Sequence, residues 1–84
     1  MNTGEIDKQI TIMQCVCKSL DEHPIEKGCT TTIETEWDTK KEMIIYHNTI
    51  KKLLNKLPSK YDHMLTLIPK REGFNHKVLI MSKY

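Results

Sequence analysis

The 84-residue sequence has no alanine, one arginine and one phenylalanine. Its three glycines lie far apart, so it has no glycine-rich loop that could surround a phosphate. It has no apolar run long enough to span a membrane, and the acidic Glu5 and Asp7 argue against a signal peptide. Three cysteines are an odd number, which favours a reducing compartment over a disulfide framework. We therefore expect a cytoplasmic protein, or one of the host cytoplasm or nucleus if the chain is viral.

Isoleucine and lysine are abundant, with ten and twelve residues, and both have A/T-rich codons. The composition therefore suggests an AT-rich genome, such as that of a low-GC bacterium, a phage or a large DNA virus. The length allows one domain, residues 1–84. No long stretch is polar enough to predict disorder.

Charge is distributed unevenly along the chain. Residues 1–37 carry three lysines against seven acidic residues, a net charge of −4, whereas residues 38–84 carry ten basic residues against four acidic ones, a net charge of +6. The total of +2 therefore hides a dipolar chain. Such asymmetry indicates a polyanionic or acidic partner, either nucleic acid or an acidic protein surface.

Two segments have the apolar spacing of amphipathic helices. The first is residues 3–20, which should end before Pro24. The second follows Thr39, an expected N-cap, and should end at Pro58. Asn2 and Glu5 have the spacing of a capping box for the first helix. The expected buried stripes are Ile6, Ile10, Met13, Cys17 and Leu20 in the first, and Met43, Tyr46, Ile50, Leu53, Leu54 and Leu57 in the second.

Three segments have the pattern of strands. Residues 30–37 are rich in β-branched residues, and residues 63–68 and 77–81 are apolar on both faces, joined by an eight-residue tip over 69–76. The expected fold is α+β in the order α-β-α-β-β, with the helices packed on a three-stranded sheet. The last strand could lie at an edge, and a right-handed crossover would follow if the first two strands were neighbours.

The closing helix and hairpin also resemble the second half of a winged-helix domain, in which a recognition helix runs into a two-stranded wing. The matching residues are 46–57, 64–68 and 78–81, about half of the chain. The resemblance implies that residues 30–37 form a further helix and that residues 46–57 contact DNA.

Candidate binding residues lie in two groups. The polar side of the second helix and the hairpin tip are both basic, and Asn can pair with an adenine edge while Lys contacts phosphates. A basic tip with one aromatic suits either base stacking or a protein pocket. A solvated Lys-rich surface is the alternative. The helix group is Lys41, Ile44, Ile45, Asn48, Lys52, Asn55 and Lys56, and the tip group is Lys70, Arg71, Phe74, His76 and Lys77.

Catalytic and metal sites are not indicated. Cys15 and Cys17 would point about 160° apart on a helix, so they cannot reach one ion, and their spacing fits no common zinc motif. Ser19, Asp21 and His23 are sequence neighbours along a turn, not a triad assembled by the fold. We expect no enzyme activity, no cofactor, no metal and no small-molecule substrate.

Two functions compete. The first is a regulator that binds nucleic acid through the two basic groups. The second is a small phage- or virus-type inhibitor or adaptor that binds a host protein, or a second copy of itself, through the hairpin. The hairpin strands carry apolar residues on both faces, so one apolar face should stay exposed after the other packs on the helices. The sequence alone leaves open which face packs on the helices: Leu79 is the first choice for the exposed face, and Ile80 takes its place if Leu79 faces the core.

Overall fold

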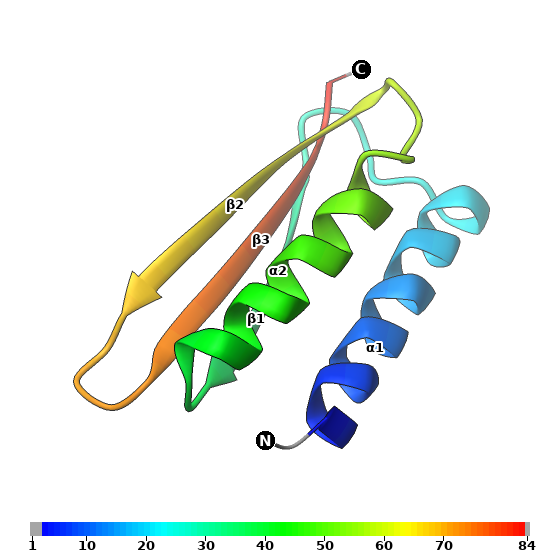
Figure 1. Ribbon diagram of the computed structural model, residues 1–84. Helices are drawn as coiled ribbons and strands as arrows, with labels where there is room; N and C mark the ends of the chain where they lie inside the picture. Colours follow the sequence, from blue (N-terminus) through cyan, green and yellow to red (C-terminus); the bar gives the residue numbers. More distant parts are fainter. Residues whose placement is uncertain (1–2, 84) are drawn as a thin grey trace.

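The computed structural model describes residues 3–83 and contains two helices and three strands (Figure 1). In chain order these are α1 (Thr3–Glu22), β1 (Thr30–Trp37), α2 (Lys40–Leu54), β2 (Tyr61–Pro69) and β3 (Phe74–Ser82). The expected α+β fold and its element order are confirmed. The described part of the chain has no helix that is long and apolar enough to cross a membrane.

The three strands form one antiparallel sheet in the order β1-β3-β2. β3 is therefore central, and the expectation that the last strand is an edge is wrong. β1 and β2 are not neighbours, because β3 pairs with both of them. β3 has no exposed residue, whereas β1 and β2 each have several, which fits the central position because pairing on both sides covers a strand most.

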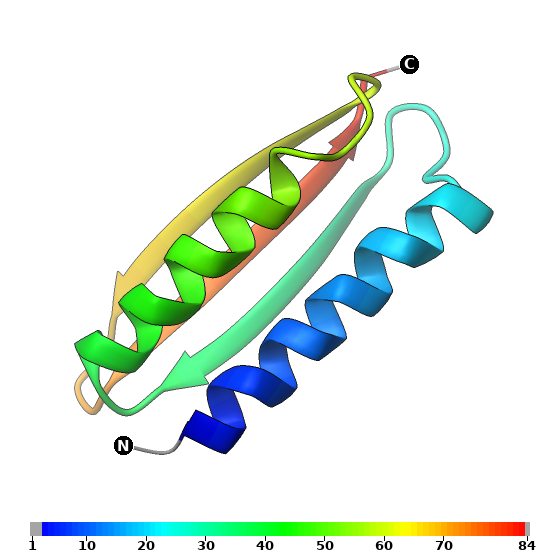
Figure 2. The same cartoon turned by 45° about the vertical axis from the view of Figure 1, so that its right-hand side comes forward.

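Both helices cover the same face of the sheet (Figure 2). Alternate residues of β3 point toward this face, and His76, Val78 and Ile80 there are fully buried. The helices contribute the expected stripes, except that Ile10, Cys17, Leu53 and Leu57 are only half-buried. The buried apolar core consists of Ile6, Met13, Leu20, Trp37, Met43, Tyr46, Ile50, Leu54, Tyr61, Val78 and Ile80.

The N-cap of α2 is confirmed. The Oγ1 of Thr39 accepts a hydrogen bond from the backbone N–H of Glu42 at 3.3 Å and donates to its carboxylate at 2.9 Å. This satisfies an N–H group that has no partner within the helix. α2 ends at Leu54, three residues before Leu57, the last residue expected in this helix, and turns lead from there to Pro58. The capping box proposed for α1 involves Asn2, which lies outside the described residues.

The hairpin is longer and its tip shorter than the sequence predicts. β2 and β3 pair over nine residues each, and the tip is Lys70–Gly73, closed by a hydrogen bond from the N–H of Lys70 to the carbonyl of Gly73 at 3.1 Å. Cross-strand pairing extends both strands beyond the residues whose composition is typical of strands.

The winged-helix resemblance does not hold. Residues 30–37 form an edge strand that pairs along its whole length with β3. A three-stranded sheet packed on two helices has no separate helix immediately before α2, which the winged-helix fold requires.

Candidate functional site

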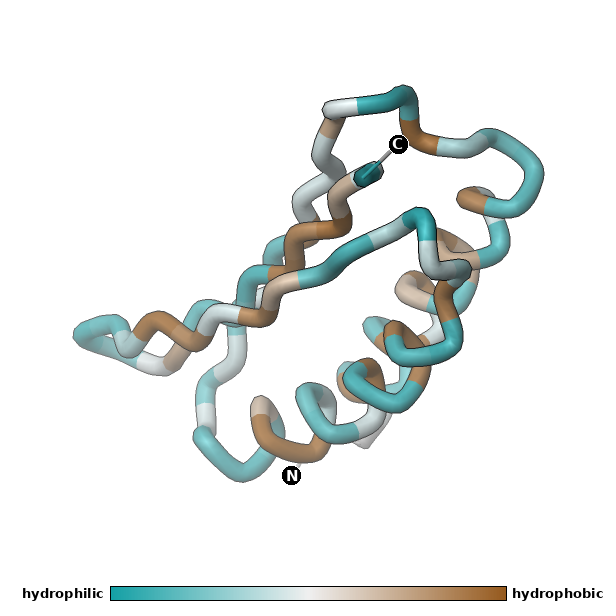
Figure 3. The backbone as a smooth tube through the Cα atoms, turned by 90° about the horizontal axis from the view of Figure 1, so that it is seen from above, coloured by the Kyte–Doolittle hydropathy of each residue, from teal (hydrophilic) through white to brown (hydrophobic). Residues whose placement is uncertain are grey.

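The face of the sheet that lies away from the helices is called here the open face. Strand alternation and the pairing register place four residues of each strand on it. Figure 3 shows that apolar positions continue along the hairpin strands almost to their tip, which is itself hydrophilic. The open-face residues are Thr30, Thr32, Glu34 and Glu36 of β1, Asp62, Met64, Thr66 and Ile68 of β2, and Asn75, Lys77, Leu79 and Met81 of β3.

β2 is the least covered strand of the sheet. Tyr61 is its one buried residue, and three of its apolar side chains are strongly exposed: Met64 at 55%, Leu67 at 42% and Ile68 at 42%. Met64 and Ile68 lie on the open face, and Leu67 lies on the helix face beyond the cover of α2. The prediction that an apolar face stays exposed is therefore confirmed, with Leu79 half-buried beside Met64.

The backbone of β2 also presents a free edge. The backbone N–H of Lys83 donates to the carbonyl of Lys60, so these two residues form a hydrogen-bonded pair at the end of the β2–β3 ladder. Hydrogen-bonded and non-hydrogen-bonded pairs alternate along an antiparallel ladder, so the even-numbered residues of β2 bond to β3. The N–H and C=O groups of His63, Leu65 and Leu67 therefore point away from the sheet. The N–H of His63 accordingly bonds to the carboxylate of Asp62 at 3.0 Å.

Glutamates neutralise two of the expected basic tip residues. Lys70 forms an ion pair with Glu36 at 2.5 Å, and Lys77 approaches Glu34 at 3.6 Å across the open face. The hydrogen bond and the charge of Lys70 lower the pKa of the Glu36 carboxyl. Both pairs are solvent-exposed, so each contributes little to stability. Their main effect is to remove positive potential from the tip.

The polar side of α2 is exposed as expected. Its lysines and asparagines reach solvent, Ile44 is 40% exposed, and Ile45 is half-buried against the core. This surface and Lys77 lie on opposite sides of the sheet, because α2 covers the helix face and Lys77 lies on the open face. The two groups of candidate residues therefore do not form one continuous surface. The exposed polar residues of the helix group, on α2 or in the turn directly after it, are Lys41, Asn48, Lys52, Asn55 and Lys56.

His76 is not a surface residue of the tip, and Phe74 is half-buried. His76 is fully buried on the helix face, and its Nε2 lies 3.0 Å from the Nδ1 of His47. Burial, followed by the charge of His47, lowers the pKa of His76 to about 4. Phe74 pairs with Trp37 and packs against the core. The prediction that these two side chains belong to a binding tip is therefore wrong, because strand alternation turns both toward the helices. Within the tip group, only Arg71 remains as an exposed cation without a described ion pair.

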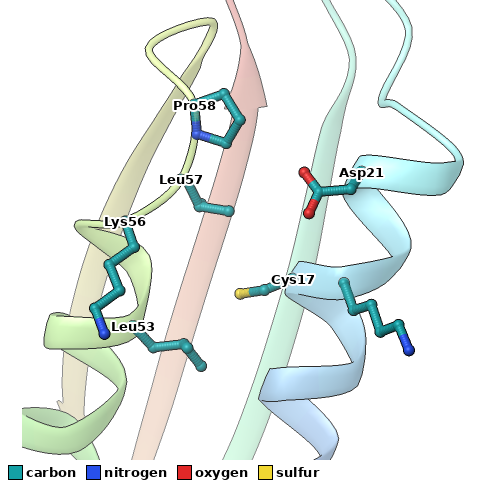
Figure 4. A pocket seen from close by; sticks show the side chains of 7 residues that line it. Cys17, Asp21, Leu53, Lys56, Leu57 and Pro58 are labelled. Atoms are coloured by element: carbon teal, nitrogen blue, oxygen red, sulfur yellow. The ribbon is translucent and has the colours of Figure 1, made fainter.

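A shallow groove separates the C-terminal halves of α1 and α2. It has a volume of about 270 Å³, and Figure 4 shows the thiol of Cys17 pointing across it toward Leu53 and Leu57. Burial, helped by the charge of Asp21, raises the pKa of Cys17. A raised pKa leaves little thiolate at neutral pH, so this thiol is a poor nucleophile. Cys15 is exposed, as expected.

Among residues 3–83, no three His, Cys, Asp or Glu side chains are grouped so that they could hold a metal ion. A scan against protein-family models, a search of curated proteins and a search of solved structures each found no match.

Proposed function

We propose that this chain is a non-enzymatic protein-binding module that engages its partner through the open face of the sheet. The observation that carries the proposal is the concentration of exposed apolar side chains on β2, which has three of the five strongly exposed large hydrophobic residues in residues 3–83. Two of these three, Met64 and Ile68, lie on the open face. Contiguous exposed apolar surface marks interaction sites. The half-buried Leu79 and Met81 of β3 extend this surface into the middle of the sheet.

The charges around this surface fit an interface rim. Glu34, Lys77, Glu36 and Lys70 lie beside the apolar residues as two ion pairs, which leaves the centre without an unpaired charge. Protein interfaces commonly have an apolar centre with a polar rim. An inhibitor or adaptor that blocks another protein would use such a surface.

The test is affinity capture with matched variants. Leu79→Glu places a charge at the centre of the open face and should abolish partner capture, whereas Lys41→Glu, on the exposed side of α2, should leave it unchanged. Proteins retained by the unmodified chain and by Lys41→Glu but lost with Leu79→Glu are the partners that the proposal requires. Equal capture by all three proteins would contradict it.

The second candidate is nucleic-acid binding, and the exposed side of α2 favours it. Lys41, Lys52 and Lys56 lie there with Asn48 and Asn55, all exposed. With the tip lysines paired to glutamates, about three phosphate contacts remain on α2 and the turn after it, so the log–log salt slope should be about −3 on duplex DNA. Lys52→Glu with Lys56→Glu should weaken binding to all sequences, while Leu79→Glu should not. No shift of a duplex by micromolar protein at low salt would exclude this candidate.

A further inference from the structure

We infer that a second copy of this chain pairs with the free edge of β2, antiparallel and centred on Thr66, so that two three-stranded sheets become one six-stranded sheet. The inference deepens the proposed function, on which it rests, by naming one partner of the same sheet. The edge, its side chains and its charges each support it.

The first support is that the middle of β2, residues 63–68, lacks the charged residues and prolines that keep sheet edges apart. Edge strands are usually protected by charged side chains or by cover from another element. The other edge, β1, carries Glu34 and Glu36 on the open face, both exposed. Residues 63–68 of β2 contain no lysine, arginine or carboxylate, and their outward N–H and C=O groups include those of Leu65 and Leu67.

The second support is the self-complementarity of the side chains in this register. With Thr66 opposite Thr66 of the second copy, Met64 lies opposite the partner's Ile68 on the open face. On the helix face, Leu65 lies opposite the partner's Leu67. The three most exposed apolar side chains of β2 each gain an apolar neighbour, and the two-fold axis makes every contact twice.

The third support is charge complementarity. The same register places Asp62 opposite the partner's Lys70, which is already paired with Glu36 of its own chain, so each of the two lysines would lie between two carboxylates. Shifting the axis by one residue, to Leu65, would instead place Lys60 opposite the partner's Lys70 and Asp62 opposite the partner's Ile68. Like charges and an unpaired carboxylate disfavour that alternative. Leu65 and Leu67 would exchange four backbone hydrogen bonds with the partner, and Pro69, which has no N–H, would end the pairing.

The first test uses charge reversal across the interface. Asp62→Lys alone puts lysine opposite the partner's Lys70, and Lys70→Glu alone puts two carboxylates opposite each other. Each single variant should weaken dimerisation roughly tenfold or more, since both ion pairs become repulsive. An equimolar mixture of the two variants should dimerise like the unmodified chain, because the heterodimer has both pairs restored. Light scattering after gel filtration, over a range of concentrations, measures the mass.

The second test is a disulfide at the two-fold axis. Thr66→Cys, with Cys15, Cys17 and Cys29 replaced by serine, should cross-link under oxidising conditions, since opposed residues of a non-hydrogen-bonded pair lie close enough for a disulfide. Thr32→Cys in the same background is the control, because it lies on the open face of the opposite edge strand and should stay reduced.

A monomeric unmodified chain, a mixture that fails to dimerise, or equal cross-linking of the two cysteine variants would overturn the inference. The proposed function fails on a different result, namely partner capture that does not change with Leu79→Glu. A monomer that still loses its partner with Leu79→Glu would therefore overturn the second-copy inference alone.

Discussion

Two glycines of this chain have a backbone conformation that other residues rarely adopt, but their surroundings differ. Gly28 has φ +79° with open space where a β-carbon would be, and Gly73 has φ +96° with the carbonyl oxygen of Trp37 where a β-carbon would be. Gly28→Ala should therefore lower the free energy of unfolding by about 1 kcal/mol, from backbone strain alone.

Gly73→Ala adds a clash of its β-carbon with the Trp37 carbonyl to a similar strain. We expect this substitution to cost roughly 2–4 kcal/mol, because the turn must open to relieve the contact. Urea unfolding of the two variants beside the unmodified chain measures both losses. Equal losses would mean that the close approach of Gly73 to Trp37 is not a constraint on the hairpin.

The buried His76 predicts a dependence of stability on pH. The folded chain protonates this imidazole only near pH 4, whereas an unfolded histidine does so near 6.5. The neutral imidazole of His76 therefore stabilises the fold fully above about pH 6.5, and this stabilisation is lost as the pH falls toward 4. The difference between the two pKa values corresponds to about 3 kcal/mol.

Urea unfolding from pH 7 to pH 4 measures this loss, and His76→Gln should flatten the pH dependence while His23→Gln, an exposed control, should not. An NMR titration of the imidazole reads the same group directly, even if His76→Gln folds poorly. A midpoint near 6.5 for His76 would contradict the buried position.

At the scale of the element, neighbouring residues of β3 face opposite sides of the sheet. Leu79 is half-buried on the open face, and Ile80 is fully buried under the helices. Leu79→Glu should therefore change the free energy of unfolding by less than about 1 kcal/mol, whereas Ile80→Glu buries an unpaired charge and should prevent folding. Circular dichroism with thermal unfolding distinguishes the two. A Leu79→Glu variant as unstable as Ile80→Glu would place both residues in the core, and the capture test would then need Met64→Glu instead.

β2 shows how one element can carry the exposed apolar surface of the protein. The two helices pack over β1 and β3, so the helix face of β2 is only partly covered, and its open face is not covered at all. Leu65 and Leu67 would otherwise belong to the core of a wider helical layer. Two helices are too few to cover three strands, which explains why the exposed apolar side chains of the sheet are concentrated on β2.

At the scale of the whole molecule, folding redistributes the charge that is divided along the sequence. Glu34 and Glu36 come from the acidic part of the chain, and Lys70 and Lys77 come from the basic part, yet the pairing of β1 with β3 brings them together on the open face. The basic residues that remain concentrated lie on α2, on the other side of the sheet. The net charges of the two chain segments are therefore a poor guide to the potential of the surface.

The amino-acid sequence is enough to predict the order of the elements, the N-cap at Thr39, most of the buried stripes of both helices and the apolar excess of the hairpin. These features depend on local spacing and on residue types within a few positions of each other. Tertiary structure decided that β3 is central, that His76 and Phe74 face the helices, and that glutamates of β1 neutralise the lysines of the tip. Each of these depends on which strands pair and in which register, and strand pairing joins residues that are far apart in the sequence.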